Sequence, residues 1–123
     1  MVPTSLTLAA IHEAHARVQD KINRTPVLTS ATLDAQAGAQ LFFKCENFQK
    51  VGAFKARGAT NAVMSLSDAE ARLGVATHSS GNHAAALARA AKLRGIPAYI
   101  VMPSNSPSAK QASVRRYGGR AHV

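Results

Sequence analysis

The chain has 123 residues with 46% hydrophobic content, which fits one globular domain and excludes a disordered tail. Residues 1–15 lack the basic start and long apolar stretch of a secretion signal, and no apolar run is long enough to span a bilayer. The single cysteine, Cys45, excludes an internal disulfide and fits a reducing compartment, so we expect a cytoplasmic protein.

The charge is strongly basic, with fifteen Lys and Arg against six Asp and Glu and no acidic residue after Glu70. Three origins are open: a nucleic-acid surface, small anionic ligands, or a fragment whose acidic counterpart is missing. The basic residues are scattered and lack interleaved aromatic residues, which disfavours the first origin. A non-catalytic basic nucleic-acid-binding module stays open as an alternative.

The amino-terminal part is predicted to hold a helix over residues 5–20, capped by Ser5 or Thr7. A loop follows over residues 23–30, where Pro26 favours an extended backbone. The helix prediction depends on helical spacing of four residues, which are Leu8, Ile11, His15 and Val18.

A short helix over residues 30–38 should end at Gly38. Residues 40–47 are rich in apolar and aromatic side chains and predict a strand. A helix should then begin at Lys55 and carry an apolar stripe formed by Ala59, Ala62, Val63 and Leu66.

The second half of the chain alternates between strand and helix signals. Strands are predicted over residues 74–80, 96–103 and 120–123. The helix over residues 81–95 has Ala84, Leu87, Ala88 and Ala91 on one face. The next helix should have Ser106 as its cap and Pro107 in its first turn.

From residue 40 the predicted order is β-α-β-α-β-α-β. This order predicts an α/β fold, with a parallel sheet, flanking helices and right-handed crossovers. Ligands in such folds bind at the carboxyl ends of the strands.

The loop "KVGAFK" leads into the helix at Lys55. Gly52 permits unusual backbone angles, and Phe54 offers a flat apolar wall. A lysine in the first turn opposes the helix dipole, and burial and the nearby Arg57 would lower its pKa further. A neutral amine is suited to a Schiff base, whereas the alternative is an ordinary surface lysine.

The loop "HSSGNHAAA" joins a strand directly to an alanine-rich helix. Gly81 permits a sharp turn, and the free N–H groups at the helix start suit a carboxylate or phosphate. The alternative is that Ser80 or Asn82 only caps the helix. Both loops should face one crevice.

The motifs "ENFQKVGAFKARGA", "SSGNHAAALA" and "GIPAYIVMPSNSPSAKQASVRRYGG" resemble those of the pyridoxal-phosphate-dependent serine/threonine dehydratase and serine racemase family. The resemblance covers essentially the whole chain and implies a fold-type-II enzyme. The related cysteine synthases differ at both loops, although a β-replacement synthase stays open as the closest rival.

The resemblance implies a role for each matching position. Lys55 carries pyridoxal phosphate covalently and acts as the catalytic base, and Phe54 lies beside the pyridine ring. Asn82 bonds the ring hydroxyl, and Ser80 is the second acid/base in racemases. The substrate carboxylate binds the turn formed by Ser79, Ser80, Gly81, Asn82 and His83.

The implied reaction removes the α-proton and β-hydroxyl of serine, threonine or 3-hydroxyaspartate, giving a 2-keto acid and ammonia. Serine racemisation is a second implied outcome. The substrate is a small hydroxy amino acid, with neither nucleic acid nor membrane as a partner, and full-length members commonly form homodimers.

The family's phosphate-binding glycine loop and divalent-cation ligands come later than Val123. The resemblance therefore implies an amino-terminal fragment, truncated within the small domain, that binds the cofactor weakly or not at all. Residues 1–50 would belong to the large domain and residues 51–123 to an incomplete small α/β domain. No metal site is expected, since His12 and His15 lack an evident third ligand.

Overall fold

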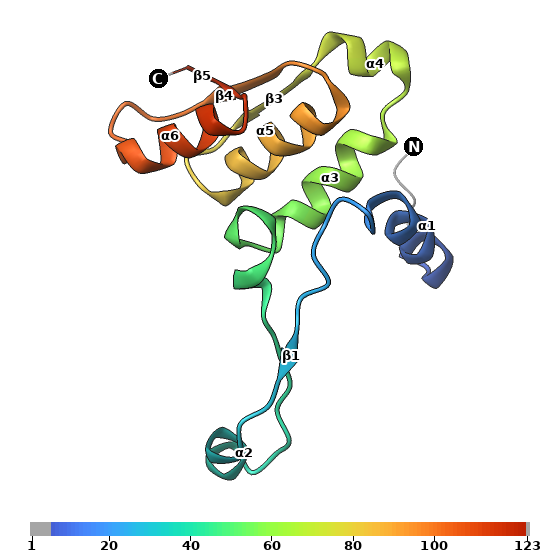
Figure 1. The fold of residues 1–123 in the computed structure, drawn as a ribbon, viewed down its shortest axis with the longest axis vertical. Coiled ribbons are helices and arrows are strands. Elements are labelled where there is room, and N and C mark those ends of the chain that lie inside the picture. Colours follow the sequence, from blue (N-terminus) through green and yellow to red (C-terminus); the bar gives the residue numbers. More distant parts are fainter. Residues whose placement is uncertain (1–5, 123) are drawn as a thin grey trace.

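The computed structural model describes residues 6–122 and contains a three-stranded parallel sheet with helices on one face (Figure 1). The strands β3 (Val75–His78), β4 (Ala98–Val101) and β5 (Arg120–His122) follow chain order in the sheet. The helices α5 (Asn82–Arg94) and α6 (Ser108–Arg116) connect them and pack against them. Right-handed crossovers between successive neighbouring strands place both helices on the same face. The predicted α/β fold with a parallel sheet is confirmed.

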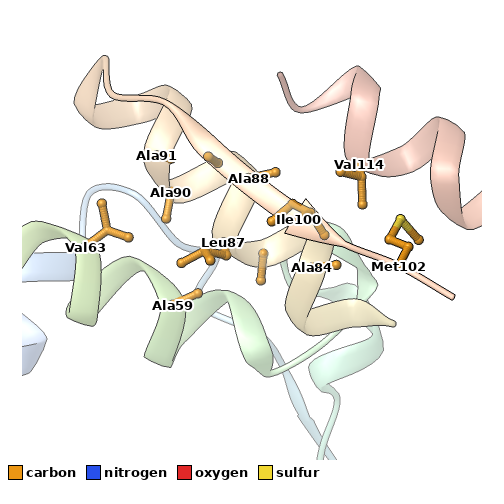
Figure 2. Packing of buried hydrophobic residues seen from close by; sticks show 12 residues of the cluster. Ala59, Val63, Ala84, Leu87, Ala88, Ala90, Ala91, Ile100, Met102 and Val114 are labelled. Atoms are coloured by element: carbon orange, nitrogen blue, oxygen red, sulfur yellow. The ribbon is translucent and has the colours of Figure 1, made fainter. Parts of the chain in front are cut away.

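The core lies between this sheet and the helices (Figure 2). Ala98 and Ile100 point from β4 toward α5, because alternate residues of a strand face the same side. The small side chains of α5 allow α3 (Lys55–Ser65) to pack closely on its outer side. All four residues of the predicted face of α5 are buried, namely Ala84, Leu87, Ala88 and Ala91.

The buried face of α3 differs in part from the prediction. Ala59 and Val63 are buried, but Ala62 is exposed and Leu66 only half-buried. Ala56 and Thr60 complete the buried face instead. Ala56 lies three residues before Ala59, and Thr60 lies three residues before Val63, so the stripe is displaced toward the start of the helix.

The first helix, α1 (Leu8–Val18), packs against α3 and is shorter than predicted. Thr7 caps it by accepting a hydrogen bond from the Ala10 N–H at 3.2 Å, whereas Ser5 lies outside the described residues. Only Val18 of its predicted stripe is buried.

The predicted first strand of the parallel sheet is wrong. Only Phe43–Lys44 (β2) is extended there, and it pairs antiparallel with Val27–Leu28 (β1) in a separate two-stranded ribbon. The short helix α2 (Ala31–Ala37) joins the two strands, with Ser30 as its cap and Gly38 ending it at φ 63°. These elements form an arm, residues 25–45, that extends away from the body (Figure 1). Glu46–Phe48 (η1) and Lys50–Gly52 (η2) are short 3₁₀ turns at its base.

Two further details depart from the sequence-based expectation. A helix that was not predicted, α4 (Asp68–Leu73), precedes β3 and has a capping box between Ser67 and Glu70. Ser106 does not cap α6, since the helix begins two residues later and the buried Ser106 Oγ has no partner within residues 6–122. The division into domains at residues 50 and 51 stays a prediction.

Candidate active site

The amino ends of two helices meet at a cavity of about 220 Å³. α3 begins at Lys55 and α5 begins at Asn82. Within the described residues, neither helix start is capped by a side chain, because the N-cap residues, Phe54 and Gly81, make no such hydrogen bond. Uncapped N–H groups at a helix start favour an anionic ligand. The cavity is lined by Phe54, Lys55, Gly58, Ala59 and His83.

Lys55 offers an accessible primary amine at this cavity. Its Nζ lies 5.1 Å from the centroid of the Phe54 ring, which confirms that the two side chains are neighbours. The ammonium group and the ring face attract each other electrostatically. Lys55 is exposed rather than buried, and its neighbour Arg57 is paired with Glu46.

The backbone turns sharply just before Lys55. Gly52 has φ 68°, as its predicted role requires. Val51 has φ 58° and ψ 13°, which is uncommon for a β-branched residue. Val51 is the only non-glycine residue with positive φ among residues 6–122. Two consecutive left-handed residues thus direct the chain into α3.

An ion pair holds the base of this turn. The Arg57 Nε and Nη2 atoms donate to the two carboxylate oxygens of Glu46 at 2.9 and 2.7 Å. The Thr25 hydroxyl donates to the same carboxylate at 2.6 Å. The guanidinium, helped by the Thr25 hydroxyl, holds the pKa of Glu46 at about 2, against the opposing effect of burial. The carboxylate in turn raises the pKa of Arg57.

The second predicted loop is built by local hydrogen bonds. The Ser79 Oγ accepts from the Gly81 N–H at 3.2 Å, and the Ser79 N–H donates to the Val101 carbonyl at 3.0 Å. The reading in which Ser80 or Asn82 caps α5 is wrong, since Gly81 holds the cap position without side-chain help among the described residues. Ser80 is half-buried and Asn82 exposed.

The structure brings together three of the predicted site residues, Phe54, Lys55 and His83, at one cavity. The remaining four lead into α5 but are not among the residues that line the cavity, and their roles stay predictions: Ser79, Ser80, Gly81 and Asn82. Gly58 and Ala59 were missed. Their spacing of three and four residues from Lys55 on one helix would have indicated them.

The structure also bears on metal binding and on membrane insertion. Residues 6–122 contain no group of three or more His, Cys, Asp or Glu side chains that could hold a metal ion. None of the helices in that range is long and apolar enough to cross a membrane.

Comparison with known proteins finds similarity over most of the chain. Residues 18–123 match the family model described as "Pyridoxal-phosphate dependent enzyme". A serine racemase of rice (Oryza sativa subsp. indica) is 63% identical over 110 residues, 89% of this chain and 32% of that protein. A beta-hydroxyaspartate dehydratase of Paracoccus denitrificans is 60% identical over 118 residues, 96% of this chain and 36% of that protein.

The solved structures agree with these relatives. The structure of maize serine racemase matches with a TM-score of 0.89 and 56% identity, covering 94% of this chain and 35% of that chain. The chain therefore spans about a third of the length of the proteins it matches.

Proposed function

Because this chain belongs to the family of pyridoxal-phosphate-dependent enzymes, we propose that Lys55 is the cofactor lysine of a hydroxy-amino-acid dehydratase or serine racemase. The observation that carries the proposal is the shared cavity of Lys55, Phe54 and His83 at two helix starts that no side chain of residues 6–122 caps. The relatives named serine racemase and beta-hydroxyaspartate dehydratase support the substrate class, which is a small amino acid with a hydroxyl or second carboxylate.

The residues present fit the cofactor in part. A primary amine at Lys55 Nζ suits an aldehyde, Phe54 offers a flat apolar surface to an aromatic ring, and free N–H groups suit an anion. Pyridoxal phosphate, when bound, withdraws electrons from the substrate α-carbon. The fit is partial because the described residues offer one lysine and two helix starts but no glycine-rich cradle for a phosphate at this cavity.

The amine of Lys55 would move the α-proton of the substrate. Its Nζ is accessible, and the flexible side chain would let the free amine reach a substrate held at the cavity. We assign the start of α5, with Ser79, Ser80, Gly81, Asn82 and His83, to the substrate carboxylate. Asn82 is further assigned to the hydroxyl of the cofactor ring.

Ser80 is assigned as the second acid/base, the group on which racemisation depends. If Ser80 Oγ delivers a proton to the face opposite Lys55, the product is the enantiomer. If the β-hydroxyl leaves before a proton is returned to the α-carbon, the resulting aminoacrylate is hydrolysed by water to a 2-keto acid and ammonia. The proposed site therefore supports both outcomes, and Ser80→Ala should suppress racemisation more than elimination.

The first test is covalent labelling of the 123-residue chain. The chain is mixed with pyridoxal phosphate, reduced with borohydride and mapped by peptide mass spectrometry. We expect weak binding, with the label concentrated on Lys55 and lost in Lys55→Ala. Equal labelling of all lysines would refute the assignment of Lys55.

The second test is activity. We expect 2-keto acid from serine, threonine or 3-hydroxyaspartate only when the chain is co-expressed with the remaining two thirds of the Paracoccus dehydratase. Lys55→Ala should abolish that activity, whereas Lys110→Ala, an exposed lysine on α6, should not. Activity with a thiol nucleophile but no keto acid would instead identify a β-replacement synthase.

A further inference from the structure

Lys55 and Arg57 lie on opposite sides of α3. Residues two apart on a helix differ by about 200° around its axis. Lys55 faces the cavity that Phe54 and His83 also line, whereas the guanidinium of Arg57 lies against Glu46. Whatever fixes Arg57 therefore sets how α3 is rotated, and with it the direction of Lys55.

We propose that the Glu46–Arg57 ion pair is a positioning device that directs Lys55 into the cavity. This inference rests on the function proposed for Lys55. The pair is bidentate, with N–O distances of 2.9 and 2.7 Å, and a planar guanidinium fork fixes orientation as well as distance. The Thr25 hydroxyl donates at 2.6 Å to Glu46 Oε1, the same oxygen that accepts from Arg57 Nη2, and so adds a second restraint on the carboxylate.

Gln49 anchors the other end of the turn. Its side chain is buried, and its Oε1 accepts from the N–H groups of Asn23 and Lys50 at 2.8 and 2.9 Å. Its Nε2 donates to the Asn23 carbonyl at 2.8 Å. The five residues between Gln49 and Lys55 are thus held at one end by Gln49 and at the other by Arg57.

The backbone between these anchors needs such support. Val51 has φ 58°, a conformation that a β-branched residue keeps only when its surroundings impose it. Without the ion pair, residues 50–54 can relax toward ordinary backbone angles. That relaxation would turn the start of α3 and move Lys55 away from Phe54 and His83.

The pair also separates two positive charges. Glu46 compensates the charge of Arg57, and among the described residues that line the cavity Lys55 is the only Lys or Arg. An anionic aldehyde that reaches the cavity thus meets one cationic amine rather than two competing groups. The direction of α3 and the compensated charge of Arg57 therefore both favour Lys55 as the lysine that reacts.

The test compares three variants with the unchanged chain. Glu46→Gln removes the charge and keeps the shape, and Arg57→Lys keeps the charge but removes the planar fork. Asp20→Asn is the matched control, because its partner Lys21 lies 2.7 Å away in an exposed pair far from the cavity residues in sequence. Each chain is labelled with pyridoxal phosphate and borohydride, and label on Lys55 is compared with label on the other lysines.

We expect the preference for Lys55 to fall about tenfold in Glu46→Gln and Arg57→Lys, because reactions that depend on orientation are sensitive to small displacements. Asp20→Asn should keep the preference. Amide hydrogen exchange provides an independent readout, and it should rise in peptides covering residues 50–57 but not in peptides of α5.

The outcomes separate the inference from the proposed function. A preference that stays within twofold of the unchanged chain in both variants overturns the positioning role. Faster exchange throughout α5 also overturns it, since the pair would then support the fold in general. If the unchanged chain shows no preference for Lys55, the assignment of Lys55 fails, and with it the positioning role.

Discussion

The arm and the core around α5 differ in how they are held. α5 buries seven of its thirteen residues, against α3, α6 and two strands. Within the described residues, α2 buries none, and both residues of β1 and of β2 are exposed. Burial of apolar surface contributes about 25 cal/mol per Å², so the core stabilises itself whereas the arm depends on local caps and one short ribbon. The apolar side chains that the arm exposes are Val27, Leu28, Leu33, Phe42 and Phe43.

The largest change in the free energy of unfolding should come from truncating a side chain at the centre of the core. Ile100 has no exposed surface, and Ile100→Ala should lower the free energy of unfolding by about 2–5 kcal/mol through lost contacts and a cavity. Urea unfolding followed by circular dichroism measures this loss. An unchanged midpoint would mean that the core around α5 is not packed as described.

The next effect comes from overfilling the same region. A Cβ atom at Gly119 would lie 2.8 Å from Val114 Cγ1 and 2.9 Å from Ala88 Cβ. Gly119→Ala should therefore destabilise the chain by about 1–3 kcal/mol.

Gly58→Ala is the matched control for stability. A Cβ at Gly58 meets no atom within 4 Å among the described residues, and alanine favours a helix over glycine. This variant should be more stable by about 0.5–1 kcal/mol. An equal loss of the free energy of unfolding in Gly119→Ala and Gly58→Ala would contradict the packing described around Gly119.

Several elements of the core could be predicted because their signals are local. Gly95 ends α5 in the left-handed conformation, and the alanine stripe that precedes it marks the buried face. The capping box of Ser67 and Glu70 is an equally local signal, and it marks the start of α4. These features depend on neighbours three or four residues apart.

The arm and the ion pair could not be predicted in this way. The pairing of Leu28 with Phe43 joins segments fifteen residues apart, and periodicity in either segment does not reveal it. Glu46 and Arg57 are eleven residues apart across an irregular turn, so only the folded chain shows their contact. The cavity itself was predictable only in part, since the strand-to-helix rule holds for the loop before α5, whereas the loop before α3 does not follow a strand of the parallel sheet.

Acid should weaken the junction between the arm and the core. Because Arg57 and Thr25 lower the pKa of Glu46 from 4.5 to about 2, folding favours the ionised carboxylate. Its contribution is complete above 4.5 and is lost as the pH falls through that value toward 2. The Arg57 side chain is 35% exposed, so solvent screening limits the contribution to about 1 kcal/mol.

This pH effect is measured as a difference between two chains. The free energy of unfolding of the unchanged chain should exceed that of Glu46→Gln near neutral pH, and the difference should shrink as the pH is lowered toward 2. A difference that is constant with pH would show that Glu46 has the same pKa in the folded and unfolded states.

The smallest effect is expected in the arm. Leu28 and Phe43 lie opposite each other in the ribbon and are 53% and 39% exposed. Leu28→Ser and Phe43→Ser should each change the free energy of unfolding by no more than about 0.5 kcal/mol, as surface substitutions usually do. Urea unfolding at two protein concentrations tests this.

The two protein concentrations matter because they distinguish contacts of the arm within its own chain from contacts with a second copy. A loss above about 1 kcal/mol that is independent of concentration would mean that the arm packs on the body of its own chain. A loss that grows with concentration would mean that the apolar side chains of the arm are buried against a second copy. Only a small loss at both concentrations agrees with an arm that is held by its own caps and ribbon, and whose exposed apolar surface contributes little to the stability of this chain.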